Sequence, residues 1–385
     1  MNILIAMDSL KGSLSSLEAN KAIMEGLTNA SPEFTVQTVP VADGGEGTVE
    51  ALVYATNGQF VNTEVTGPLG EPVQARYGIL GDQRTAVIEV AEACGLPLLS
   101  EEQRNPLLTT TYGVGEMILD AVNKGCLEFI IGLGGSATTD AGIGMLQALG
   151  YQFLDEKGIS VGFGGTELIR IAKVDVRLVP DSVKAVKFRI ACDVNNPLYG
   201  LNGAAYIYGP QKGATPEMVE ELDAGLRHFA GIVLDELEID FQRISGAGAA
   251  GGLGAAFAGF LNSQLESGVE MILEGTQLEE KLQQVDLVIT GEGKLDGQTS
   301  MGKAPSGIAR LSAKLNIPVI ALAGDISEGN SSLHETGITA YFTIVSGPTD
   351  LEQAMKPEVA QANLRRVGEQ VGRLLKMGMG KKYRG

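Results

Sequence analysis

Residues 131–144 combine glycines with serine and threonine in a pattern that suits the binding of an anion. The segment reads IGLGGSATTDAGIG and lies between an apolar, strand-like run and a helical pattern. Glycines leave backbone N–H groups open to a ligand, and the hydroxyls of Ser136, Thr138 and Thr139 add donors near the start of the predicted helix. We therefore expect this segment to bind a phosphate. The alternative is a tight strand-to-helix turn whose hydroxyls only cap the helix.

Polar residues also follow the first two predicted strands, at the carboxyl ends where open α/β sheets bind their ligands. Asp8, Ser9 and Lys11 follow the first strand, and Asp43 and Glu46 follow the second. Asp8 could accept a proton or hold a metal ion, and Lys11 could pair with a carboxylate or a phosphate. The alternative is that Asp43 and the nearby serines cap helices.

An oxygen-rich turn follows the strand predicted at residues 188–192. It contains Asp193 and Asn195 and ends at Pro197. Carboxylate and carbonyl oxygens suit Mg²⁺, which favours one or two carboxylates together with waters and phosphate oxygens. An Asx turn closed by the proline is the alternative.

The segment 289–303 places two carboxylates and two lysines between glycines, directly after an apolar strand. Glu292 or Asp296 could carry a metal ion or take a hydroxyl proton. Lys294 or Lys303 could neutralise the charge on a phosphoryl group during its transfer. The alternative is a solvated, charged loop.

Residues 246–251 match the dinucleotide-binding pattern G-x-G-x-x-G, so an NAD-dependent oxidoreductase is a competing hypothesis. The stretch before them, 238–244, is a poor buried strand, and no clear strand ending in Asp or Glu follows about twenty residues later. Small residues for close packing or for the approach of a nucleotide fit this segment better. The chain contains no P-loop pattern and no H-R-D or D-F-G set.

The composition is that of an ordinary globular protein, with 44% hydrophobic and 20% charged residues in 385. A net charge of −18 disfavours nucleic acid and anionic membranes as partners. A small anion can still bind where local cations, backbone amides or a divalent metal make the local electrostatic potential positive. The three cysteines form no zinc pattern and indicate reduced thiols.

No apolar run reaches the 18 or so residues that span a bilayer, and the first residues enter a strand without a basic and apolar leader. We therefore expect a cytoplasmic protein. The sequence leaves open whether it forms a homo-oligomer. The only histidines, His228 and His334, lie in polar surroundings, which disfavours histidine catalysis.

Apolar strand-like runs alternate with helical patterns, which predicts an α/β protein with a mainly parallel sheet covered by helices on both faces. The breaker cluster at residues 67–72 is a plausible linker. Beyond it glycine-rich loops are frequent until about residue 284, after which regular alternation returns. This predicts two domains, one formed by residues 1–68 and 285–385 and an inserted one formed by residues 69–284.

Six motifs, taken in order, resemble those of the bacterial glycerate kinase family of the glycerate 2-kinase type. They are MDSLKG at 7–12, ADGGEGT at 42–48, GLGGSATTDAG at 132–142, ACDVNNPL at 191–198, GAGAAGG at 246–252 and TGEGKLD at 290–296. The similarity spans nearly the whole chain, with no departure in these segments.

The resemblance implies an ATP-dependent enzyme that phosphorylates D-glycerate on its 2-hydroxyl to give 2-phosphoglycerate and ADP, with Mg²⁺. It also implies a Rossmann-like domain, an inserted α/β domain and a cleft between them. A glycerate 3-kinase, or a kinase of a related small hydroxy acid, is the nearest alternative. A non-catalytic ligand-binding protein is disfavoured by the number of paired acidic and basic groups in loops.

On this basis we assign three sets of site residues. The catalytic set, of which Asp193 and Asp296 also hold the metal ion, is Asp193, Glu292, Lys294 and Asp296. The set that binds glycerate is Asp8, Ser9, Lys11, Asp43 and Glu46. The set that binds ATP is Gly134, Gly135, Ser136, Thr138, Thr139, Asn195 and Lys303.

Overall fold

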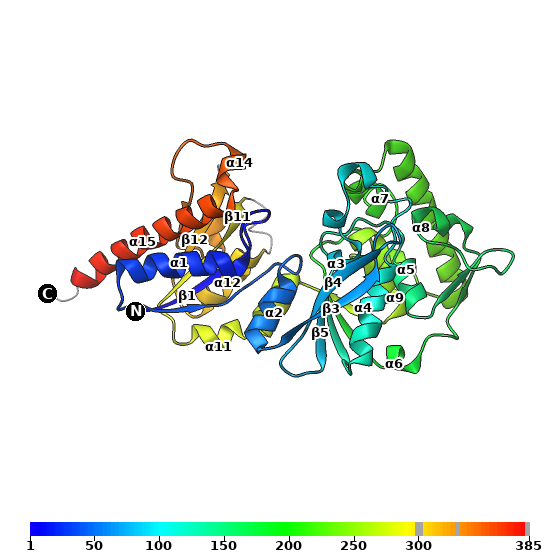
Figure 1. Cartoon of the computed structure of the whole chain (residues 1–385), viewed down its shortest axis with the longest axis horizontal. Helices are drawn as coiled ribbons and strands as arrows, with labels where there is room; N and C mark the ends of the chain where they lie inside the picture. Colours follow the sequence, from blue (N-terminus) through cyan, green and yellow to red (C-terminus); the bar gives the residue numbers. More distant parts are fainter. Residues whose placement is uncertain (297–302, 328–331, 382–385) are drawn as a thin grey trace. The chain divides into compact units, whose positions relative to one another are not determined.

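The computed structural model describes residues 1–296, 303–327 and 332–381, and the chain divides into two compact units (Figure 1). Unit 1 consists of Met1–Asp43, Glu50–Thr56 and Val269–Gly385. Unit 2 consists of Gly44–Val49 and Asn57–Gly268. Both chain ends therefore belong to one unit, although the boundaries differ from those expected at residues 68 and 284.

The boundaries differ because two segments pair or pack in ways that the sequence pattern did not reveal. Strand β3 (Gln59–Thr66) pairs antiparallel with β4 (Pro72–Ile79), so residues 67–72 close a hairpin inside unit 2 and do not link domains. At the other boundary, α11 (Leu278–Leu282) and nearly all of α10 (Gly268–Gly275) belong to unit 1.

Unit 1 contains a five-stranded sheet in the order β13-β12-β11-β1-β2, and every pair of neighbours is parallel. Its strands are β1 (Asn2–Met7), β2 (Thr35–Thr38), β11 (Leu287–Leu295), β12 (Val319–Ile326) and β13 (Ala340–Thr343). The predicted parallel sheet is confirmed here.

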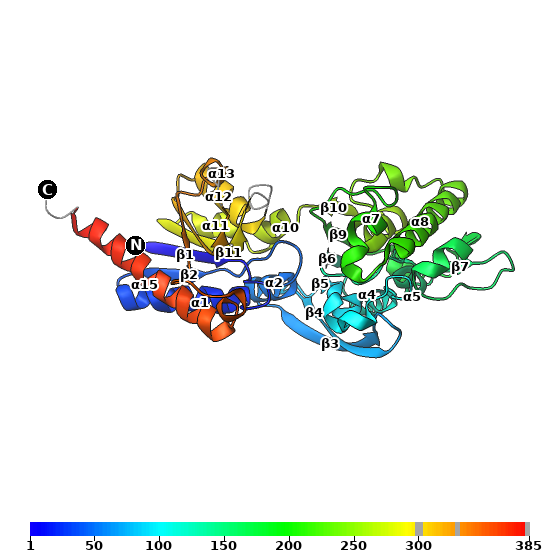
Figure 2. The same ribbon diagram turned by 90° about the horizontal axis from the view of Figure 1, so that it is seen from above.

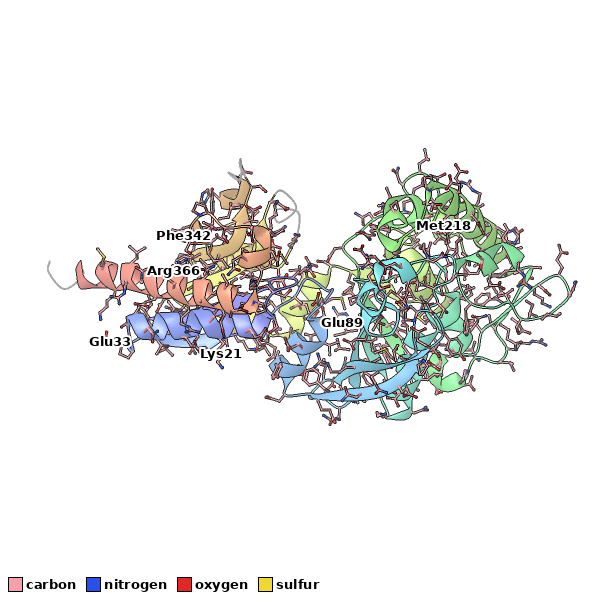
Figure 3. All side chains as sticks on the ribbon, turned by 45° about the horizontal axis from the view of Figure 1, so that its top comes forward. Lys21, Glu33, Glu89, Met218, Phe342 and Arg366 are labelled. Atoms are coloured by element: carbon pink, nitrogen blue, oxygen red, sulfur yellow. The ribbon has the colours of Figure 1, made fainter. Side chains whose placement is uncertain are left out.

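Helices cover both faces of this sheet (Figure 2). On one face, α1 (Ser16–Ala30) packs against β1 and against the long α15 (Pro357–Lys381); on the other, α12 (Ala304–Lys314) packs against β11 and β12. Arg366 of α15, labelled in Figure 3, donates a hydrogen bond to Ile344 O just beyond β13 (3.1 Å). Unit 1 also contains α13 (Ser332–Glu335), α14 (Leu351–Ala354) and, from Glu50 onward, α2 (Thr48–Thr56).

Alternation along β1 explains why both faces need cover. Ile3, Ile5 and Met7 join the apolar core beneath α1 and α15, whereas Leu4 and Ala6, which alternate with them, are equally buried on the opposite side. A strand that is apolar on both faces is the pattern of a parallel sheet enclosed by helices.

Unit 2 contains a six-stranded sheet in the order β10-β9-β6-β5-β4-β3. The four strands from β10 to β5 are mutually parallel, and β4 pairs antiparallel with both of its neighbours. The strands not yet given are β5 (Thr85–Glu89), β6 (Glu128–Gly132), β9 (Lys187–Ala191), β10 (Gln264–Glu266) and the separate antiparallel pair β7 (Gln152–Leu154) and β8 (Lys173–Asp175).

The core of unit 2 is formed where helices pack on this sheet and on each other. α4 packs against β3, β4, β5 and α5; α9 packs against β9 and β10; α8 packs against α7. The helix bounds are α3 (Ala91–Cys94), α4 (Tyr112–Asn123), α5 (Ile143–Ala148), α6 (Asp181–Lys184), α7 (Ala204–Tyr208), α8 (Pro216–Leu237) and α9 (Leu253–Phe260). Short 3₁₀ turns lie at 96–98, 101–103, 165–170, 210–212, 241–243 and 249–252.

Among the residues that the structure describes, no helix combines the length and the apolar character needed to cross a bilayer.

The contact between α1 and α15 is close enough to test directly. A Cβ at Gly26 of α1 would lie 2.1 Å from Arg365 O and 2.7 Å from Glu369 N of α15. We expect Gly26→Ala to separate the helices and to lower stability by about 1–3 kcal/mol, measured as a lower thermal unfolding midpoint.

The matched control is Gly231→Ala in α8, where an added Cβ would meet nothing within 4 Å. That change is expected to raise stability by about 0.5–1 kcal/mol, because alanine favours a helix more than glycine does. Equal effects of the two substitutions would contradict the packing argument.

Candidate functional site

In unit 1, several predicted site residues gather where β1 ends beside β11. Met7 lies opposite Gly291 in the parallel register, and Asp8 N extends the pairing by donating to Gly291 O (2.8 Å). Asp8 and Glu292 are therefore brought to the same edge of the sheet. Residues from the two ends of the chain meet there, as expected for the carboxyl edge of a parallel sheet.

Asp8 is a buried carboxyl group with one unsatisfied oxygen. Its Oδ1 accepts from Ser9 N (2.7 Å), whereas its Oδ2 is buried without a hydrogen-bond partner among the described residues. Burial raises the pKa of Asp8 to about 7, and the charges of Asp43 and Glu292 add to this while Lys11 opposes it. A carboxyl group with such a pKa can exchange a proton near neutral pH.

Lys11 supplies a cation beside that carboxyl group. Its Nζ lies 2.9 Å from Asp43 Oδ2, and the lysine side chain is half exposed. Burial alone would lower the pKa of Lys11, but the charge of Asp43 and its hydrogen bond outweigh it and raise the pKa. Lys11 is therefore charged and accessible to a small anion.

Glu292 and Lys294 lie within β11, which continues to Leu295, and not in a loop after the strand as expected. The extension is possible because β11 stays paired with β12 as far as Leu295. Glu292 is buried and Lys303 Nζ donates to its Oε2 (3.3 Å), so Lys303 belongs to the same cluster as Asp8.

Lys294 is exposed and pairs with Asp325, which lies opposite it on β12 (3.1 Å). Asp296 directly follows β11 and is half-buried. Residues 297–302 of the predicted charged segment lie outside the described residues.

In unit 2, the turn after β6 exposes its backbone. Gly134 and Gly135 are exposed, and Gly135 has a φ of +75°, in the left-handed region that favours glycine. Within the part of the chain that the structure describes, the N–H groups of Gly134, Gly135 and Ser136 donate no hydrogen bond to the protein. Consecutive free amides in such a turn form a concave anion-binding site.

The segment that contains α3 holds this turn in place through backbone hydrogen bonds. Ala137 N donates to Cys94 O (2.8 Å) and Leu96 N donates to Gly135 O (2.9 Å). Thr109 Oγ1 donates to Ala137 O (2.8 Å). The turn is thus fixed before any ligand binds.

Two features of this segment differ from the sequence-based expectation. α5 begins only at Ile143, so the free amides do not lie in its first turn. Thr138 and Thr139 are fully buried and Ser136 is 4% exposed, whereas the exposed residues of the turn are Gly134 and Gly135, which offer backbone groups alone. The neighbouring Asp140 is buried too, and its carboxylate accepts hydrogen bonds from Thr111 N (2.9 Å) and Thr111 Oγ1 (2.8 Å).

The segment 246–252 packs beneath the same turn and does not follow a strand. A Cβ at Gly251 would lie 1.9 Å from Thr138 O, and Ala141 N donates to Gly251 O (3.0 Å). A 3₁₀ turn at 241–243 precedes it where the dinucleotide fingerprint needs a strand. The glycines thus serve close packing, which argues against the NAD-dependent hypothesis.

The glycine-rich segment 44–47 lies along the carboxyl edge of the unit 2 sheet. A Cβ on Gly132 would lie 2.6 Å from Gly44 O, and a Cβ on Gly44, whose φ is +89°, would lie 2.6 Å from Gly268 Cα. Only glycines allow these backbones to approach so closely. Glu46, in this segment, is exposed.

Glu89, labelled in Figure 3, ends β5 opposite Gly132 and is a candidate site residue that the sequence did not reveal. Its Oε1 accepts from Val49 N (2.9 Å). Burial raises the pKa of Glu89 to about 7, helped by the charges of Glu92 and Glu46. Its place at the carboxyl end of a strand was the signal that could have found it.

Asp193 and Asn195 lie exposed in the turn after β9. Asp193 Oδ1 accepts from Gly268 N (3.0 Å), and Asn195 Oδ1 accepts from Ser245 Oγ (3.0 Å). Asp193 belongs to unit 2, whereas Asp296 belongs to unit 1. Their joint assignment to a metal ion stays a prediction.

Lys212 is the second residue that sequence reasoning missed. It is buried, and its Nζ donates to Thr138 O (2.6 Å) and to Ser136 Oγ (3.1 Å) behind the exposed turn. The sequence shows only a lysine in the turn PQKG at 210–213, a setting typical of the surface. Nothing local to that turn predicts its burial.

No group of three or more histidine, cysteine, aspartate or glutamate side chains gathers to hold a metal ion among the described residues. Mg²⁺ does not need such a group, because it usually keeps several waters and binds through one or two carboxylates and substrate phosphates.

Comparison with known proteins gives one consistent family. A family model described as the glycerate kinase family matches residues 3–376. The chain is 48% identical to a glycerate kinase of Bacillus subtilis over 356 residues, covering 92% of this chain and 93% of the relative. It is 45% identical to the glycerate 2-kinase of Escherichia coli over 379 residues, covering 98% and 99%.

A solved structure supports the same grouping. The crystal structure of a "putative glycerate kinase 2" from Salmonella typhimurium LT2 is similar to this chain with a TM-score of 0.88 and 44% sequence identity, covering 99% of each chain. The α/β architecture predicted from the sequence is therefore confirmed.

The raised pKa of Glu89 predicts a pH-dependent stability. An unfolded glutamate has a pKa near 4.5, so between that value and about 7 the native protein binds the extra proton, and stability falls as pH rises through this range. Glu89→Gln keeps the shape but cannot ionise. Its unfolding midpoint should match wild type at about pH 5 and exceed it by about 2–8 °C at about pH 8.

Glu128→Gln, which changes an exposed carboxylate at the opposite, amino end of β6, is the control and should show no such divergence. A difference in unfolding midpoint between Glu89→Gln and wild type that stays constant with pH would contradict the raised pKa of Glu89.

Proposed function

We propose, because this chain belongs to the glycerate kinase family, that it transfers the γ-phosphoryl group of ATP to the 2-hydroxyl of D-glycerate, giving 2-phosphoglycerate and ADP. The preference for the 2-hydroxyl is inferred from the likeness to the Escherichia coli glycerate 2-kinase. ATP is the co-substrate that a kinase requires.

The structural observation that carries this proposal is the turn 134–136, where three consecutive N–H groups have no acceptor among the described residues. Phosphoryl transfer depends mainly on positioning and on electrostatic stabilisation of the phosphate oxygens. Backbone amides that are fixed before the ligand binds supply both, because they do not have to reorganise during the reaction.

For the acceptor, we assign the carboxylate of glycerate to Lys11. Lys11 is the half-exposed cation of the unit 1 cluster and already pairs with a carboxylate, that of Asp43. The hydroxyl that reacts is bonded to the carbon next to the carboxylate of glycerate. A group that takes its proton must therefore lie near Lys11.

Asp8 meets this requirement better than Asp296. The charge of Lys11 acts on Asp8, and Asp8 Oδ2 has no hydrogen-bond partner among the described residues. With a pKa near 7, Asp8 can accept the hydroxyl proton as the new O–P bond forms and the bond from the γ-phosphorus to ADP breaks. Ser9, which follows it, is buried in the same cluster and is assigned to the same substrate.

We assign Mg²⁺ to Asp193 and Asp296, with Glu292 as a further candidate. Asp193 and Asp296 directly follow or lie just past the parallel strands β9 and β11, Glu292 lies within β11, and oxygen ligands are those that Mg²⁺ prefers. When bound, the ion would neutralise charge on the ATP phosphates. Lys294 and Lys303 carry positive charge on β11 and beside it, and we assign them to the same phosphates.

The proposal is tested by incubating the purified protein with ATP, Mg²⁺ and D-glycerate. We expect formation of ADP that depends on D-glycerate, and ³¹P NMR should show 2-phosphoglycerate. Formation of 3-phosphoglycerate would contradict the regiochemistry. Absence of glycerate-dependent ADP, with turnover of another small hydroxy acid, would contradict the substrate assignment.

The role of Asp8 is tested by Asp8→Asn, which keeps the shape of the side chain but cannot accept the proton. We expect kcat to fall by about 100-fold or more, with a much smaller change in the KM for glycerate. The acid limb of the wild-type pH profile, near pH 7, should report this group.

The matched control is Asp286→Asn, because Asp286 precedes β11 and accepts from Asn2 N at the opposite, amino edge of the same two strands. Its kcat should stay close to that of wild type. If Asp296→Asn abolishes turnover while Asp8→Asn does not, the base is Asp296.

A further inference from the structure

The ammonium group of Lys212 is buried directly behind the turn that we assign to phosphate. The residue ends the 3₁₀ turn at 210–212 and is 2% exposed. A buried ammonium group is costly unless its protons are hydrogen-bonded. Here the Nζ of Lys212 donates to Thr138 O (2.6 Å) and to Ser136 Oγ (3.1 Å).

The charge of Lys212 is not cancelled by a contact ion pair among the described residues. Burial lowers its pKa to about 8, and the thiol of Cys94 and the carboxylate of Asp140 act against this from nearby. The oxygens of Asp140 are already engaged by Thr111 and Gly142. Lys212 therefore keeps a positive potential close to the free amides of the turn.

The bond to Ser136 also orients its hydroxyl. Because Ser136 Oγ accepts from the ammonium group, its own proton must point away from Lys212. That proton has no acceptor among the described residues, and the neighbouring amides of Gly134, Gly135 and Ser136 have none either. A hydroxyl that accepts a bond from a cation is polarised and is a stronger donor.

We propose that Lys212 is a positioning residue for nucleotide binding: it fixes the turn through Thr138 O and directs the Ser136 hydroxyl, as a fourth donor beside the three amides, toward a phosphate of ATP. This inference rests on the proposed function, because it takes the anion at the turn to be a nucleotide phosphate. Lys212 would not contact ATP itself but would act on it through Ser136 and Thr138.

A purely structural lysine would look different, and the chain contains one for comparison. Lys281 of α11 is half-buried, and its Nζ donates to a single carbonyl, Thr276 O (2.7 Å), just after α10. That is an ordinary interaction of a cation with the end of a helix. Lys212 instead joins a carbonyl and a hydroxyl within one turn that has unsatisfied donors.

The experiment compares Lys212→Met, Ser136→Ala and the double variant, with Lys281→Met as the matched control. We expect Lys212→Met to weaken ATP binding by about tenfold or more, measured by calorimetric titration with ATP and Mg²⁺ and as a raised KM for ATP. The KM for D-glycerate should stay within about twofold, because Lys212 does not act on the acceptor. Lys281→Met should leave both values near those of wild type.

The double variant separates positioning from general damage. If Lys212 acts through Ser136, the loss in the double variant should be clearly smaller than the sum of the two single losses. Additive losses, or equal increases in both KM values for Lys212→Met, would overturn the proposal. If Lys212→Met does not fold, Ser136→Ala decides: an unchanged affinity for ATP would overturn the proposal, and a loss of about threefold or more with an unchanged unfolding midpoint would support it.

The two proposals fail in distinguishable ways. A wild-type protein that binds ATP but does not phosphorylate D-glycerate contradicts the proposed function. The same ATP titrations of the variants then still decide the role of Lys212. A wild-type protein that is active while Lys212→Met binds ATP normally contradicts only the role of Lys212.

Discussion

Parallel pairing between strands brings the functional side chains together in each unit. In unit 1 the register of β1 with β11 sets Met7 opposite Gly291, so that Asp8 and Glu292 emerge at the same edge. In unit 2 the register of β5, β6 and β9 aligns Glu89, Gly132 and Ala191 in the same way. Residues that are tens or hundreds of positions apart in sequence thus become neighbours through backbone hydrogen bonds.

Both edges keep polar groups that a protein built only for stability would avoid. Asp8 is buried and Glu89 is half-buried, both with pKa values raised to about 7, and Lys212 is a buried cation without a contact ion pair among the described residues. Each costs folding free energy. Sites that bind and transfer charged groups commonly contain such perturbed residues, because a desolvated group interacts more strongly with a ligand. The net charge of −18 therefore does not exclude an anion at these edges, where lysines and free amides lie among the carboxylates.

The sequence predicts the apolar strands well, because continuous runs such as Asn2–Met7 have only one favourable place, inside a parallel sheet. It predicts β3 poorly, because that edge strand is largely polar and its hairpin turn looks like a linker. For the site, strand-end polar residues such as Asp8 were predictable by position. The burial of Lys212 was not, since it depends on a turn that lies more than seventy residues away along the chain. Asp140, two residues beyond Thr138, is likewise held by long-range hydrogen bonds from Thr111.

The carbonyl oxygen of Thr138 is held by Lys212 and lies against the backbone of Gly251, which leaves no room for a side chain there. Two glycine-rich segments separated by more than a hundred residues therefore pack as one structural unit. An engineer who wished to exchange this anion-binding turn for one from another enzyme would have to transplant both segments, and the lysine between them, as one module.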